Sequence, residues 1–179
     1  MERYSFSARV LHWLMAAGFL FMWVCGYAMT TLVADDSALE EMLFFLHIST
    51  GVTLLFLFCL RVVARVTSSV PAPLEALTGW EKTLSHLGHL ALYALPFAII
   101  FIGWAESDFG GHGVTFFGLS MPKLFPTMET LWGFNLETTT ANIHKWLAYT
   151  MLVVVVAHIA AVVKHRVEGH DVLHRMTFK

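Results

Sequence analysis

Four long stretches without Asp, Glu, Lys or Arg constrain this chain more than any other feature of its sequence. They cover residues 10–34, 42–60, 83–105 and 146–163 and are 18 to 25 residues long. A helix needs about 20 mostly apolar residues to cross a bilayer, and it satisfies its own backbone polar groups there. Only 13% of all residues are charged, about half of the ~25% usual in soluble domains. The sequence therefore predicts a membrane protein and argues against a soluble enzyme.

We expect an all-α fold, an integral membrane four-helix bundle formed by a single domain over residues 1–179. Its spans are placed at about residues 8–32, 42–66, 83–105 and 141–166. The longest connection is expected between residues 106 and 141. Four tryptophans are expected to lie at the membrane interfaces, where this residue is enriched: Trp80, Trp104, Trp132 and Trp146.

The two sides of the predicted bundle differ in charge. An even number of spans puts both termini and the connection 67–81 on one side, which has nine Lys or Arg and five acidic residues, a net charge of +4. The other side has two basic and eight acidic residues, a net charge of −6. Because Lys and Arg are enriched in cytoplasmic segments, we expect both termini in the cytoplasm. No basic run interleaved with aromatics occurs, so nucleic-acid binding is not expected.

Six histidines lie in or at the ends of the predicted spans, where polar residues are costly unless they are paired or functional. They are His12, His47, His86, His89, His144 and His158. His144 and His158 are 14 residues apart, about 40° short of four full helical turns, so they share one face. A rise of 1.5 Å per residue separates them by about 21 Å, enough to place one near each membrane surface. The spacing indicates two binding sites at two depths.

Depth assigns a partner to each of these two histidines. His12 is level with His158 near the cytoplasmic surface, and His47 is level with His144 near the outer surface. Paired imidazoles without a carboxylate or thiolate at that depth suit bis-histidine haem better than zinc or a di-iron centre. The chain has no Cys-x-x-Cys-His motif for covalent attachment, so two haems b are expected. Gly51, on the face of His47, either admits a porphyrin edge or serves ordinary helix packing.

Several segments resemble the bacterial cytochrome b561 family over nearly the whole chain. They are Arg9-Val10-Leu11-His12-Trp13, His47-Ile48-Ser49-Thr50-Gly51, His86-Leu87-Gly88-His89, Phe117-Gly118-Leu119 with Pro122, and the His144/His158 pair. The resemblance implies a four-helix membrane bundle with two haems b in the inner membrane of a bacterium. It implies that His12 and His158 ligate the cytoplasmic haem iron, and His47 and His144 the periplasmic one. The chain is similar to the standalone members described as superoxide oxidases, and also to cytochrome b subunits of formate dehydrogenase and nickel-iron hydrogenase.

The resemblance also implies a quinone site beside the cytoplasmic haem, where His89 and His165 match polar positions. His165 follows His158 by seven residues, about 20° from two full turns, and so lies on the same face. A histidine there can donate a hydrogen bond and a proton to a quinone carbonyl. The alternative for His165 is a solvated side chain among lipid headgroups. Either His86 or His89 could instead be an alternative haem ligand.

Two functions follow from these expectations. The first is a superoxide:quinone oxidoreductase that passes electrons from a periplasmic one-electron donor, superoxide, to membrane quinone, with ubiquinone as the expected acceptor. The second is a cytochrome b anchor subunit that exchanges electrons between a periplasmic redox protein and the quinone pool. A standalone chain favours a small diffusible donor. The negative outer side favours a basic protein partner, because steering of the superoxide anion needs positive potential, which only Lys123 or Lys145 offers locally.

Overall fold

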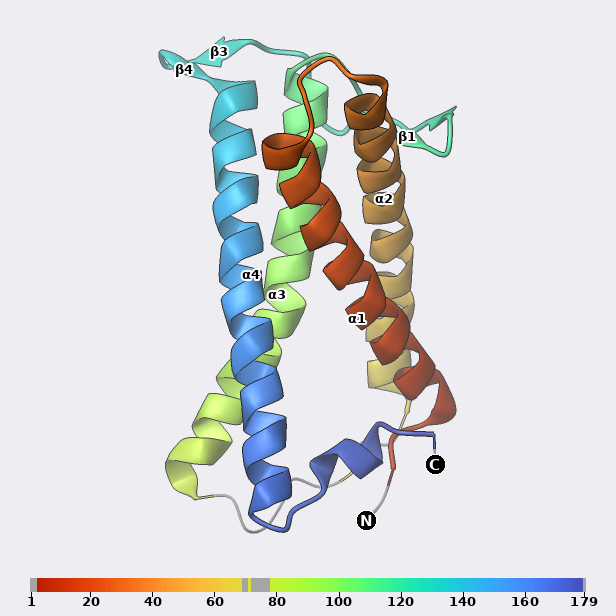
Figure 1. The fold of residues 1–179 in the computed structure, drawn as a ribbon, viewed down its shortest axis with the longest axis vertical. Helices are drawn as coiled ribbons and strands as arrows, with labels where there is room; N and C mark the ends of the chain where they lie inside the picture. The colour runs from red at the N-terminus through yellow and green to blue at the C-terminus, as the bar shows by residue number, and fades with distance from the viewer. Residues whose placement is uncertain (1–2, 69–70, 72–77, 179) are drawn as a thin grey trace.

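The computed structural model of this chain describes residues 3–68, 71 and 78–178 and contains four long helices (Figure 1). They are α1 (Phe6–Tyr27), continued by a π-helical turn (Ala28–Leu32), α2 (Ala38–Thr67), α3 (Gly79–Phe109) and α4 (Leu136–Val167). All four are long and apolar enough to cross a membrane, which confirms the four-helix membrane bundle. Residues 69–70 and 72–77 of the predicted connection 67–81 lie outside the described part. We call the end with both chain termini the termini end and the opposite end the loop end.

Side chains at the helix N-termini explain where the helices begin. Ser5, Ser37 and Asn135 accept hydrogen bonds from the amides of Ala8, Glu40 and Thr138, at 3.3, 3.2 and 2.8 Å. At the start of α3, the Glu81 carboxylate accepts from the Thr78 amide at 2.9 Å. Each bond satisfies an amide that has no partner within its helix.

The helices pack as two pairs, α1 with α2 and α3 with α4. One core cluster joins Met15, Leu54 and Phe58, with Tyr93 packed against it. Many large apolar side chains elsewhere on the helices are exposed on the outside of the bundle, as expected for a surface that faces lipid rather than water. Figure 1 shows that α1 leans away from α4 toward the termini end.

Residues 110–135 cover the loop end with two small antiparallel hairpins, β1 (Thr115–Phe116) with β2 (Leu119–Ser120) and β3 (Thr130–Leu131) with β4 (Phe134–Asn135). Both two-residue turns, Phe117-Gly118 and Trp132-Gly133, have positive φ at both positions, the backbone that matches the twist of a hairpin. The Phe117 amide donates to Ser49 of α2 at 3.0 Å. Buried Asp108 of α3 accepts from the amides of Leu124 and Phe125 at 2.8 and 3.1 Å. These bonds hold the connection on the bundle.

Two details differ from the sequence expectation. The connection is 110–135 rather than 106–141, because α3 and α4 continue past the charged residues at their loop ends. Trp104 is not an interface anchor: it is only 7% exposed and packs with Val52 and Val114 under the connection. Trp80, Trp132 and Trp146 are exposed.

The C-terminal segment returns from α4 to α1. After α4, the short helix η2 (Val172–Arg175) lies across the termini end (Figure 1). Three bonds tie the segment to α1 and the residues before it: the Tyr4 amide donates to the Arg175 carbonyl at 3.2 Å, Arg9 Nη1 to the Thr177 carbonyl at 2.7 Å, and Trp13 Nε1 to the Met176 carbonyl at 2.9 Å. The segment therefore links α4 to the helix that holds His12.

Candidate haem sites

At the loop end, α2 and α4 bring His47 and His144 together. Their ring centroids are 6.1 Å apart and their planes meet at 69°. His144 Nδ1 lies 3.0 Å from the Ile99 carbonyl of α3, to which it can donate a hydrogen bond that leaves Nε2 free to bind a metal. His47 Nδ1 is buried and has no hydrogen-bond partner among the described residues.

Two glycines give these rings their space. A methyl group on Gly103 of α3 would lie 3.0 Å from both Cε1 and Nδ1 of His144, and one on Gly26 of α1 would lie 3.3 Å from His47 Cε1. Gly51, for which the sequence left open either a porphyrin edge or ordinary helix packing, faces Met22 at an ordinary contact distance of 3.6 Å, which agrees with helix packing. The glycine facing a ring depends on the packing between helices, so spacing along one helix could not identify Gly26 or Gly103.

At the termini end, three histidines from three helices converge. The ring centroids of His12 of α1 and His158 of α4 are 6.5 Å apart, with planes at 61°. The ring of His89 of α3 lies 6.0 Å from that of His158, with planes at 73°. His89 Nδ1 lies 2.7 Å from the Ser85 carbonyl and can donate to it, which leaves its Nε2 as an acceptor. His86 is exposed and has no described contact with these three rings.

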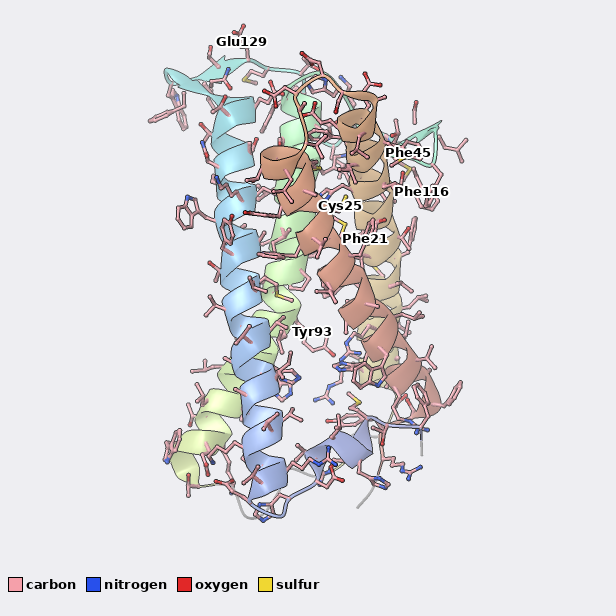
Figure 2. The ribbon with its side chains drawn as sticks, in the orientation of Figure 1. Phe21, Cys25, Phe45, Tyr93, Phe116 and Glu129 are labelled. Carbon is pink, nitrogen blue, oxygen red and sulfur yellow. The ribbon has the colours of Figure 1, made fainter. Side chains whose placement is uncertain are left out.

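Arg61 of α2 and Tyr93 of α3 complete this site. Arg61 Nη2 lies 3.2 Å from His12 Nδ1, and Nη1 donates to the Ala8 carbonyl at 3.3 Å. The guanidinium carbon is 5.9 Å from the centroid of the Tyr93 ring, and Tyr93 points toward the middle of the bundle (Figure 2).

His165 lies beyond this cluster and is held by its own helix end. Its Nδ1 is 3.4 Å from a Glu168 carboxylate oxygen, and it makes no described contact with His12, His89 or His158. Lys164 also donates to Glu168, at 3.2 Å. This hydrogen bond from Lys164 holds the pKa of the exposed Glu168 carboxyl below its usual range.

The spacing of both pairs fits one iron between two imidazoles. The ring centroids are 6.1 and 6.5 Å apart, a separation that would leave room for an iron bound to both imidazoles through bonds of about 2.0 Å. Within the described residues, no three His, Cys, Asp or Glu side chains come close enough to hold a bare metal ion. A haem iron needs only two protein ligands, because the porphyrin supplies four more. The residues at both depths therefore fit haem.

Four membrane helices with paired histidines at two depths have the architecture of a membrane-bound b-type cytochrome. The chain matches the family described as Prokaryotic cytochrome b561 over residues 3–179, and it belongs to this family of haem b membrane electron-transfer proteins. It is 33% identical over 180 residues to "Cytochrome b561 homolog 2" of Escherichia coli (strain K12), covering 99% of this chain and 93% of that protein. It is 27% identical over 180 residues to "Probable superoxide oxidase CybB" of Yersinia pestis, covering 98% of this chain and 96% of that protein.

Proposed function

We propose that this protein oxidises superoxide on one side of the bacterial inner membrane and reduces quinone near the other side. The observation that carries the proposal is the pair of histidine sites at opposite ends of one bundle, with ring separations of 6.1 and 6.5 Å. His47 and His144 are the proposed ligands of one haem b iron, and His12 and His158 those of a second. Haem b, when bound, supplies a reversible one-electron couple at each depth. The relative named as a probable superoxide oxidase supports superoxide as the electron donor in this proposal.

The reaction balances with one quinone and two superoxide anions. Two superoxide anions give up two electrons and become two dioxygen molecules. Quinone accepts these two electrons and two protons and becomes quinol. The proposed orientation places the loop end in the periplasm and both termini in the cytoplasm, following the excess of Lys and Arg at the termini end. At the loop end, exposed Lys145 directly follows His144 in the sequence, and it offers positive potential for an anionic donor.

His89 and His165 are the residues proposed to serve quinone at the termini end. His89 lies 6.0 Å from His158, ring centroid to ring centroid, and its Nε2 can take up a proton and donate it to a quinone oxygen. His165 is half-buried between that site and the exposed Glu168, to which its Nδ1 lies close. A proton entering from the cytoplasm could therefore reach His165 through Glu168. Ubiquinone is the quinone that we propose.

The first experiment tests the ligands and the donor together. We expect two non-covalent haems per purified chain by pyridine-haemochrome analysis, and reduction of the haem absorption bands by superoxide without any protein partner. His47→Ala and His144→Ala should each remove the same haem, and His12→Ala and His158→Ala the other. One haem per wild-type chain, or loss of a haem in His89→Ala, would contradict the ligand assignment. A wild-type protein with two haems that superoxide does not reduce would contradict the donor.

The second experiment tests the quinone residues. In His89→Ala and His165→Ala, both haems should stay bound and reducible, while reoxidation by a soluble ubiquinone analogue slows about tenfold or more, the usual scale of one lost general acid. Stopped-flow spectroscopy of prereduced protein measures this rate. His86→Ala, an exposed histidine on the same helix as His89, is the matched control and should reoxidise at the wild-type rate. Wild-type rates in both test variants would place the quinone elsewhere.

The second candidate function, an anchor subunit for a periplasmic redox protein, is favoured by one feature of the loop end. The β3–β4 hairpin exposes Trp132 at 89% and Phe134 at 65%, and exposed aromatic residues are enriched at protein interfaces. The side of the chain that includes this hairpin has two basic and eight acidic residues, which suits a basic partner. Co-purification of a periplasmic redox protein that is lost in Trp132→Ser would favour this candidate over superoxide oxidation.

A further inference from the structure

Arg61 places a cation inside the termini end without an acidic partner. It lies on α2 and is half-buried, and no Asp or Glu among the described residues forms a salt bridge with it. A charged side chain at membrane depth is costly unless it is paired or reaches water. No negative charge among the described residues therefore balances Arg61 through a salt bridge.

The contacts of Arg61 hold its guanidinium at the histidine site. It donates to the Ala8 carbonyl of α1 and lies beside His12 Nδ1. It also lies over the ring of Tyr93 of α3. The positive charge is thus held between three helices, beside His12, one of the two proposed ligands of this iron.

Haem binding at this site would remove one of these contacts. A guanidinium can only donate hydrogen bonds. In the contact at 3.2 Å, Arg61 must therefore be the donor and His12 Nδ1 the acceptor. When a neutral imidazole binds iron through Nε2, its proton is on Nδ1, and the arginine and the ring would then point hydrogens at each other. Arg61 would have to turn from His12 toward another acceptor.

We propose that this acceptor is a carboxylate of the haem itself, so that Arg61 is the anchor for a propionate group at the termini-end site. The inference rests on the proposed haem b at this site, whose two propionates are anionic. Arginine is suited to this role because its planar fork of donors matches a carboxylate and keeps its charge at any physiological pH. Pairing there satisfies both the cation and the propionate, which would otherwise be unpaired at membrane depth.

The test compares haem release from Arg61→Gln and from the wild type, each loaded with haem b. We expect the termini-end haem of Arg61→Gln to pass to a soluble haem-scavenging globin about tenfold faster or more, because hydrogen bonds to a charged partner are lost. Arg61→Lys, which keeps the charge without the fork, should fall between the two. The haem held by His47 and His144 reports in the same sample that each variant is folded. Arg65→Gln, one turn farther along α2 and exposed, is the matched control.

A second arm replaces haem b with its dimethyl ester, whose propionates carry no charge. The wild type and Arg61→Gln should then release the termini-end haem at the same rate. An Arg61→Gln effect of equal size with both haems would overturn the proposal, because the arginine would then act only through His12. No effect with haem b would also overturn it. Failure of the haem assignment is distinguishable, since wild-type protein would then hold no haem that depends on His12 and His158.

Discussion

The interior of this bundle leaves little room around the proposed iron ligands. The rings of His144 and His47 pack against glycines, where a side chain would crowd them. A side chain on Gly103 would meet the His144 ring at 3.0 Å, and the hydrogen bond to the Ile99 carbonyl restrains that ring. Gly103→Ala should therefore overpack the site at a cost of about 1–3 kcal/mol. We expect about tenfold faster release of the loop-end haem, measured by transfer to a scavenging globin.

The control for Gly103→Ala is Gly88→Ala on the same helix. A methyl group on Gly88 would meet no atom within 4 Å, and alanine favours the helix by up to about 1 kcal/mol over glycine. Haem release from Gly88→Ala should match the wild type. If both variants released haem alike, close packing of Gly103 on the ring would not be the cause.

Among the elements, the C-terminal segment depends most on a few identifiable contacts. The Trp13 indole donates to the Met176 carbonyl at 2.9 Å, and Arg9 donates to the Thr177 carbonyl at 2.7 Å. Arg9 also lies over the rings of Phe6 and Phe178, at 5.9 and 5.4 Å. These contacts join the two ends of the chain beneath the termini-end site.

Trp13→Phe should loosen this segment without unfolding the bundle. Loss of one hydrogen bond costs about 1 kcal/mol, which raises the open fraction of the segment about fivefold. Limited proteolysis should then cleave the segment that follows Gly169 about fivefold faster. The rate of cleavage follows the fraction of molecules with an open segment when opening and closing are fast. Trp80→Phe is the control, since Trp80 is exposed at the start of α3. Equal cleavage of wild type and Trp13→Phe would show that the indole does not hold the segment.

At the scale of the whole molecule, the two ends differ in charge and in the loops they present. Glu129 lies at the loop end (Figure 2), and exposed Arg166 lies in the last turn of α4 at the termini end. If the Lys and Arg excess sets the orientation, a membrane-impermeant maleimide should label Glu129→Cys in cells with a permeabilised outer membrane. Arg166→Cys should be labelled only after the inner membrane is disrupted. The wild type, with its own Cys25 and Cys59 in the helices, gives the background labelling. The reverse labelling pattern would contradict the proposed orientation.

Local properties of the sequence were enough to predict the four helices, and also that His47 lies level with His144 and His12 with His158. Apolar composition and length determine which segments can span a bilayer, and the helical rise fixes how far His144 lies from His158. Rotation of each helix about its axis and the choice of neighbouring helices depend on many packing contacts distributed along the chain. For that reason the tertiary structure alone showed that His89 rather than His86 lies beside His158, that Gly103 faces His144, and that Arg61 reaches His12. It also buried Trp104, because the connection 110–135 folds over α3, and no pattern within α3 specifies that contact.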